Sequence, residues 1–186
     1  MEKRGLMTDN KTRLAALLAA IFAAAAMRLV PHPPNFAPIA AMALFSGTQM
    51  PRRLLSFAIP FAALVLSDAI LGGFYPGMNF VYASFALTVL IGWAIAKRKS
   101  PLVIGGAAMA SSVLFFLLTN FGMWLFSGFY PLTSAGLIAC YVAAIPFFQN
   151  TLAGDLVFTG LLFGGFAIAE RLLPAIRESR LAHAPA

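Results

Sequence analysis

The chain has 186 residues, of which 61% are hydrophobic and only 10% are charged. Soluble globular proteins carry roughly a quarter charged residues. The low charge and the mean hydropathy of +0.87 therefore exclude a soluble domain and predict a membrane protein. Each span takes about 20 residues, so the length allows six or seven spans and excludes a second domain. The net charge of +7 is interpreted as a topology signal, not as nucleic-acid binding.

The apolar segments, taken in chain order, predict an all-α integral membrane protein. Six of them cover residues 14–30, 37–47, 54–71, 80–96, 102–126 and 152–173. A seventh, residues 136–148, is short. At about 1.5 Å per residue, segments 37–47 and 136–148 reach only roughly 17–20 Å, against a hydrocarbon core of about 30 Å. Both are expected to begin or end inside protein.

The positions of the basic residues indicate how many segments cross the membrane. Twelve of the 13 basic residues flank the apolar segments, namely Lys3, Arg4, Lys11, Arg13, Arg52, Arg53, Lys97, Arg98, Lys99, Arg171, Arg177 and Arg180. A six-transmembrane helix bundle places all twelve on one side, which the positive-inside rule assigns to the cytoplasm. We therefore expect a bacterial inner membrane protein with cytoplasmic tails 1–13 and 174–186. Residues 136–148 are then expected to form a short re-entrant or interfacial helix on the outer side, broken at Pro146 before the last span.

Polar and aromatic side chains gather near the outer ends of these segments, whereas the inner half is almost entirely apolar. Polar groups in lipid are costly unless they are satisfied, so groups at one depth are expected to face each other or a cavity. An interfacial aromatic belt with helix caps is the alternative. The candidate ligand-binding residues are Arg28, His32, Asn35, Asp68, Tyr75, Asn79, Tyr82, Asn120, Trp124, Tyr141, Asn150 and Asp155.

Individual positions allow more specific expectations. Asp68 lies near a helix C-terminus, where the helix dipole disfavours a negative charge, so either an ion pair with Arg28 or direct ligand contact is expected. Asp155, in the first turn of the last expected helix, would cap that helix or contact a ligand. His32 lies between prolines and is either a loop histidine or a ligand contact. The amide of Asn120, inside a long apolar helix, is expected to bond across the bundle or to a substrate.

Two ridges of small residues run along the first segment, Ala15/Ala19/Ala23 and Ala16/Ala20/Ala24. Such spacing permits close helix packing, either inside the protein or on a partner. Catalytic signatures are missing from the sequence: it has no HExxH, no GxSxG and no P-loop, and no Cys/His metal cluster. We therefore expect no enzymatic activity and no intrinsic cofactor.

The sequence resembles two groups of known membrane proteins. The runs 66–73 (Leu-Ser-Asp-Ala-Ile-Leu-Gly-Gly), 145–148 and 154–156, together with six short spans and the alanine ridge, resemble the substrate-binding S components of energy-coupling-factor vitamin transporters. Residues 28–38 and 119–122 also look like a family of uncharacterised small bacterial membrane proteins. The first resemblance implies uptake of a vitamin-like ligand from the outer side. It also implies a coupling membrane subunit with an ATPase pair, docked on Ala15, Ala19 and Ala23.

Among S components, the chain is most similar to the small cobalamin-specific ones. In part of that group a cysteine in the loop after the third helix ligates the cobalt, but residues 74–80 contain none and Cys140 lies elsewhere. If cobalamin is the ligand, aromatic and amide side chains would hold it, with His32 as the candidate axial ligand.

Two other classes of function stay open. An intramembrane enzyme would use Asp68, Asp155 or His32 as acid or base, with these groups within hydrogen-bond reach of one another. A membrane assembly or scaffold protein would have the cavity filled by side chains.

Overall fold

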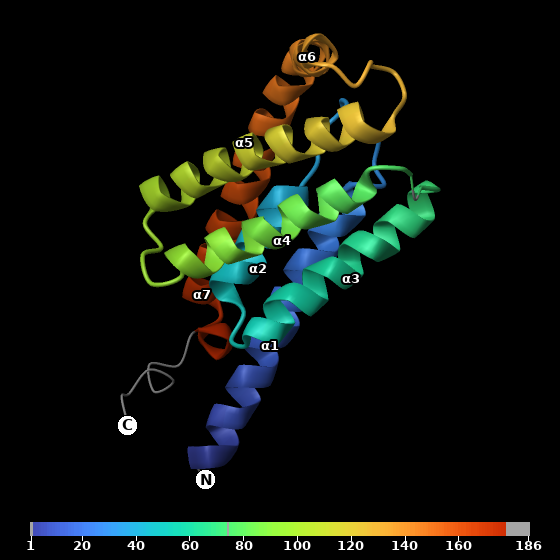
Figure 1. Cartoon of the computed structure of the whole chain (residues 1–186). Coiled ribbons are helices and arrows are strands. Elements are labelled where there is room, and N and C mark those ends of the chain that lie inside the picture. The colour runs from blue at the N-terminus through green and yellow to red at the C-terminus, as the bar shows by residue number, and fades with distance from the viewer. Residues whose placement is uncertain (1, 74, 178–186) are drawn as a thin grey trace.

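The computed structural model describes residues 2–73 and 75–177, with side chains from residue 11 onward. Figure 1 shows an all-helical bundle, which confirms the predicted α class for this part of the chain. The elements are α1 (Glu2–Met27), α2 (Ile39–Gln49), α3 (Arg53–Leu71), α4 (Met78–Ile95), α5 (Pro101–Phe126), α6 (Ser134–Thr159), the π-helical turn η1 (Gly160–Gly164), α7 (Gly165–Leu172) and the 3₁₀ turn η2 (Pro174–Ile176).

Four helical segments are long and apolar enough to cross a membrane. They are α3, α4, α5 and the continuous stretch Ser134–Leu172. Length and composition thus support the membrane class that the sequence predicted. The expected tail before residue 14 is also helical from Glu2 onward, because α1 begins there.

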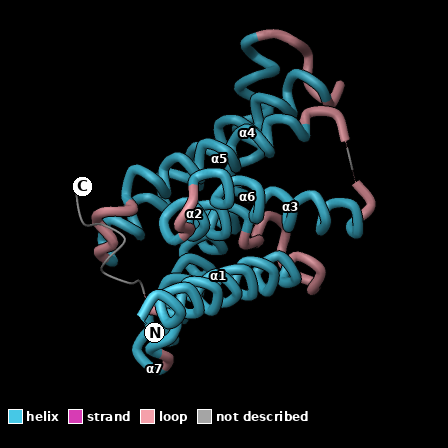
Figure 2. The backbone as a smooth tube through the Cα atoms, turned by 90° about the horizontal axis from the view of Figure 1, so that it is seen from below, coloured by secondary structure: helices cyan, strands magenta, loops and turns pink. Residues whose placement is uncertain are grey.

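The short helix α2 forms the centre of the bundle. All residues from Ala40 to Thr48 are buried, and Figure 2 shows α2 between α1 and the layer of α4 and α5. The sequence counted this short segment among the six crossings and predicted that it begins or ends inside protein, and its burial agrees with the second expectation. α2 approaches α4 closely at two glycines: a Cβ on Gly47 would lie 2.3 Å from the carbonyl oxygen of Val89, and one on Gly92 would lie 2.7 Å from that of Leu44.

The predicted separate outer helix and last span are in fact one helix. α6 continues through Pro146 and joins η1 and α7 without a loop, so the expected break is wrong. A proline removes one backbone hydrogen bond and bends a helix, but neighbouring helices can support the bend. In Figure 1 the beginning of α6 is seen end-on and the remainder descends, which shows this change of direction. Asp155 consequently lies deep within α6 and not in a first turn, so its predicted role as a cap is wrong.

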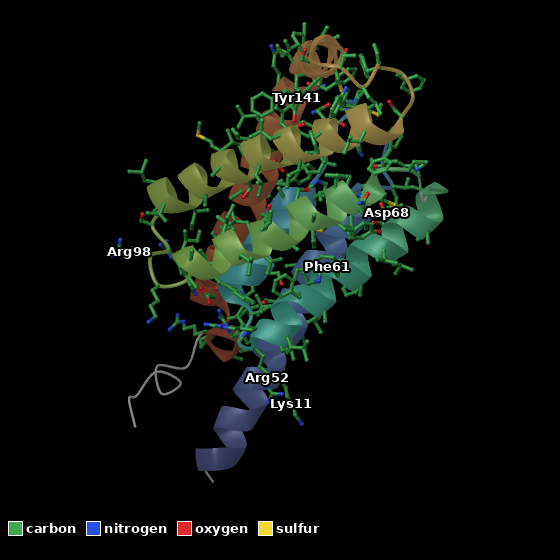
Figure 3. All side chains as sticks on the ribbon, viewed as in Figure 1. Lys11, Arg52, Phe61, Asp68, Arg98 and Tyr141 are labelled. Carbon is green, nitrogen blue, oxygen red and sulfur yellow. The ribbon has the colours of Figure 1, made fainter. Side chains whose placement is uncertain are left out.

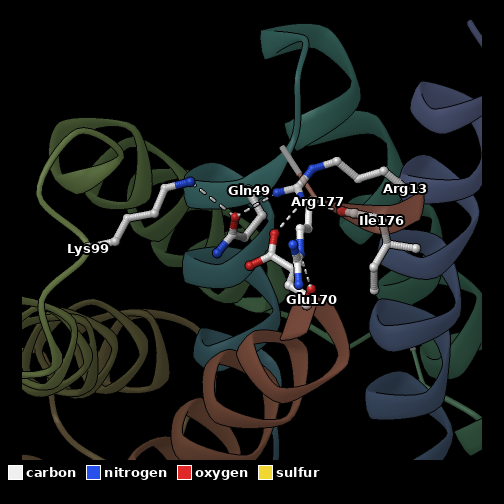
Figure 4. A network of polar contacts seen from close by, with 6 residues as sticks. All are labelled: Arg13, Gln49, Lys99, Glu170, Ile176 and Arg177. Atoms are coloured by element: carbon white, nitrogen blue, oxygen red, sulfur yellow. Dashed lines mark hydrogen bonds and ion pairs between the residues drawn. The ribbon is translucent and has the colours of Figure 1, made fainter. Parts of the chain in front are cut away.

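A buried network closes the basic end of the bundle, where Figure 3 places Lys11 and Arg52 away from Asp68. Arg13 forms an ion pair with Glu170 and donates hydrogen bonds to the carbonyl oxygen of Ile176 (2.6 Å) and to Gln49 Oε1 (3.2 Å). Figure 4 shows these contacts joining α1, α2, α7 and η2. The sequence treated Arg13 as a topology charge in a tail, but its side chain is buried.

The two alanine ridges of α1 have different environments. Ala24 belongs to the buried core and Ala16 and Ala20 pack against it, whereas the three alanines of the other ridge are exposed. The exposed ridge consists of Ala15, Ala19 and Ala23. One ridge therefore packs inside the protein, and the other is open to a partner or to lipid.

Replacing Gly47 with alanine should lower the free energy of unfolding by about 1–3 kcal/mol, because the new Cβ cannot fit without moving α4. Thermal unfolding of the purified protein in detergent measures the change. Gly106→Ala is the matched control, since a Cβ there meets nothing within 4 Å. Equal stability of the two variants would show that α2 and α4 do not depend on the close approach.

Replacing Arg13 with methionine should lower the free energy of unfolding by about 3 kcal/mol, because Glu170 and the carbonyl of Ile176 lose their shared donor. The same unfolding measurement applies. Lys11→Met, at an exposed position of the same helix, should leave the stability nearly unchanged. If the Arg13→Met and Lys11→Met proteins unfold at the same temperature, the result would contradict a structural role for the network.

Candidate ligand-binding site

Two adjacent cavities lie at the end of the bundle opposite the basic end. The larger, of about 480 Å³, has walls of Phe115 and Phe116 from α5 and Phe147 and Phe148 from α6. Asn120 is among its polar lining groups, but its Nδ2 donates to the carbonyl oxygen of Phe116 on the same helix (2.8 Å) and not across the bundle. Pockets that bind small molecules combine a largely apolar wall with a few polar groups, and their volumes are of this order.

The smaller cavity, of about 250 Å³, is more polar. Arg28, His32, Asp68 and Asp155 line it. Its walls overlap those of the larger cavity, so the two chambers are neighbours. The residues that line both are Asn35, Tyr75, Val81, Phe115 and Thr151.

Arg28 and Asp68 form the ion pair that the sequence predicted. Arg28 Nη2 lies 2.6 Å from Asp68 Oδ1, and both side chains are almost completely buried. The guanidinium also donates to the hydroxyl of Ser67, and the Tyr82 hydroxyl donates to Asp68 Oδ2 at 2.8 Å. Asp68 thus has a donor on each oxygen, which offsets the cost of placing a carboxylate in the last turns of α3.

Asp155 has a much poorer environment. Its residue is only 2% exposed, and the hydroxyl of Ser112 donates to its Oδ2 at 2.7 Å. The same hydroxyl also lies 3.1 Å from the carbonyl oxygen of Ala108. Because a serine hydroxyl has one proton, these two acceptors share a single donor.

The rim of the site is formed by the segment before α2 and the turn before α4. His32 and Asn35 are both exposed, and Asn35 adopts a left-handed backbone with φ of 63°, which asparagine tolerates better than most residues. His32 Nδ1 lies 2.9 Å from the carbonyl oxygen of Pro33. Partial burial raises the pKa of Tyr75, and Asp68 raises it further while Arg28 opposes this. The Tyr75 hydroxyl therefore stays protonated and can donate.

Seven of the twelve candidate residues line a cavity: Arg28, His32, Asn35, Asp68, Tyr75, Asn120 and Asp155. Tyr82 acts on the site through Asp68, as described above. The remaining four serve elsewhere, since Asn79 is exposed and the other three bond to backbone carbonyls. Those three bonds run from Trp124 to Pro131 (3.0 Å), from Tyr141 to Leu117 (2.6 Å) and from Asn150 to Pro34 (3.0 Å).

The sequence did not single out the four phenylalanines of the larger cavity or the Ser112 partner of Asp155. Phenylalanine is common in this chain, with 18 copies, so composition cannot separate a cavity wall from a lipid-facing side chain. The pairs at 115–116 and 147–148, each close to a polar residue of the same helix, were the available signal. No three side chains of His, Cys, Asp or Glu converge as metal ligands in the described part of the chain.

The fold and the site together define a class: an all-helical protein of membrane type with a two-chambered polar and aromatic pocket at one end. The chain belongs to DUF6580, a family of unknown function whose model matches residues 8–176. No curated protein and no solved structure is detectably similar to it.

Replacing Arg28 with methionine should lower the free energy of unfolding by about 3–5 kcal/mol, because Asp68 would be left as a buried charge without a cation. The double variant Arg28→Met/Asp68→Asn should recover much of this loss, since neither partner then carries a charge. Thermal unfolding in detergent compares the two. A double variant as unstable as the single one would show that the ion pair is not the reason for the loss.

Proposed function

We propose that this protein is a membrane-embedded binding subunit for the uptake of a vitamin or related small cofactor. The observation that carries the proposal is the pair of adjacent cavities, one walled by phenylalanines and the other by charged and amide groups. A flat molecule with a polar edge matches both chambers. The exposed position of His32, Asn35 and Tyr75 at the rim gives such a ligand a way in.

The distribution of charge supports a direction for this uptake. The basic end would lie in the cytoplasm of a bacterial inner membrane, and the cavities would open on the outer side, with six crossings and both termini inside. The exposed ridge Ala15/Ala19/Ala23 would be the docking face for a coupling membrane subunit with an ATPase pair, as in the S components that the sequence resembles. Small residues allow close helix approach there.

Cobalamin is one candidate ligand, with the unbonded Nε2 of His32 as its axial ligand. The volumes of the chambers favour a smaller molecule, because a corrinoid is larger than ligands that ordinarily occupy pockets of this size.

Two other functions have less support. An intramembrane enzyme would need Asp68, Asp155 and His32 to exchange protons. Asp68 is already bonded to Arg28 and Tyr82, and none of the three bonds to another within the described residues. A scaffold protein would have its interior filled, whereas two chambers of about 480 and 250 Å³ are open here.

The test is an unbiased mass spectrum of small molecules that co-purify with the protein, followed by calorimetric titration. The panel is cobalamin, other vitamins and nucleobase derivatives. We expect one compound to bind at micromolar affinity or tighter. Ala143→Trp, which fills the larger cavity, should weaken that binding by at least about tenfold, or about 1.4 kcal/mol.

Ala139→Trp is the matched control, because Ala139 is exposed one turn earlier on α6 and does not line either cavity. It should bind like the unmodified protein. If no compound co-purifies or binds, or if both tryptophan variants bind equally well, the proposed function is wrong.

A further inference from the structure

Asp155 is a buried carboxyl group that lines the smaller cavity. Its Oδ2 shares the single proton of Ser112 with a backbone carbonyl. Among the described residues no group donates to Oδ1, and the side chain lines the smaller cavity. A carboxylate accepts about four hydrogen bonds, and a buried one that lacks them is costly. Capping of α6 by Asp155 is excluded by the continuity of that helix.

The start of α2 also lines this cavity. Ile39 and Ala40, the first residues of α2, line it. The preceding residue is Pro38, and no side chain caps this helix start. The first N–H groups of a helix have no partner within the helix and carry partial positive charge. A hydrogen-bond acceptor on a ligand therefore suits the start of α2. A hydrogen-bond donor on the ligand suits Asp155.

The remaining charges of the smaller cavity neutralise each other, because Arg28 and Asp68 are paired. The helix start of α2 and the carboxyl group of Asp155 then line one space from different elements. This combination favours an uncharged ligand edge with one donor and one acceptor over a free cation or a free anion. Phe115 and Tyr75 line both chambers, so a flat ring system can extend from the polar edge between aromatic walls.

We propose that the site binds a flat heterocycle whose edge carries a ring N–H beside a carbonyl oxygen, as in a lactam or a pyrimidine-like ring. The N–H donates to Asp155, and the carbonyl oxygen accepts from the first N–H groups of α2. The ring body lies against the phenylalanine wall of the larger cavity. This inference rests on the proposed binding function and names the chemical class of its ligand.

The experiment uses the bicyclic lactam carbostyril and its N-methyl derivative, which differ only at the ring N–H. Both are titrated into the full-length protein in lipid nanodiscs, with empty nanodiscs correcting for partition into lipid. Carbostyril should bind at least about tenfold more tightly than its N-methyl derivative, since the hydrogen bond from the ring N–H to Asp155 is lost on methylation.

Asp155→Leu should reduce this preference to within about twofold by weakening carbostyril binding and leaving the N-methyl compound nearly unaffected. Asp155→Asn, a change of similar shape, should show an intermediate preference and serves if the leucine variant does not fold. Thr159→Val is the matched control one turn away, because the Thr159 hydroxyl is buried without a partner among the described residues and does not line either cavity. It should keep the full preference.

The outcomes separate the inference from the proposed function. Equal binding of the two compounds, absence of binding by both, or a preference that survives in Asp155→Leu and in Asp155→Asn would overturn the inference. The proposed function would still stand if the vitamin panel yields a ligand. If that panel and the co-purified material also yield nothing, both fall together.

Discussion

The ion pair between Arg28 and Asp68 is the interaction on which the cavity end of the molecule depends. A buried charge in an apolar bundle is tolerated only when it is paired and hydrogen bonded. Asp68 meets this requirement with Arg28 and Tyr82. Arg28 follows the end of α1, so the pair holds the irregular segment before α2 against α3 and α4. That segment forms the rim and one wall of the smaller cavity, so the ion pair helps to hold this wall in place.

Both ends of the bundle contain buried charged groups that need partners, but the two ends satisfy them in different ways. At the basic end, Arg13 reaches across to Glu170, Gln49 and the carbonyl of Ile176, which closes the structure around a buried guanidinium. At the other end, polar groups line open chambers between aromatic walls. The basic end also has a cavity, of about 390 Å³, but it lies beside the Arg13 network and is lined by Gln49, Lys99, Glu170 and Arg177 and not by aromatic walls.

Position along the bundle could be predicted from the sequence, but direction around each helix could not. The hydropathy pattern and the basic residues located the polar end and paired Arg28 with Asp68, because only one cation was available at that depth. Trp124 and Tyr141 share the same depth yet turn to backbone carbonyls, since periodicity in a uniformly apolar helix does not show which face meets a cavity. Pro146 was misinterpreted as a break because a proline ends most helices in water, whereas here the helix bends and continues.

The continuity of α6 changes how the three acidic residues whose side chains the structure describes are interpreted. Glu170 has Arg13, and Asp68 has Arg28 and Tyr82, so both are satisfied by groups that hold helices together. Asp155 has one shared hydroxyl proton and is the most deeply buried of the three. A helix start at residue 152 would have stabilised it through the dipole, but α6 begins at Ser134 and removes that explanation. Carboxylates with a full set of donors stabilise the fold, whereas a buried carboxyl group that lines a cavity and has one shared donor is where a ligand's hydrogen-bond donor gains most.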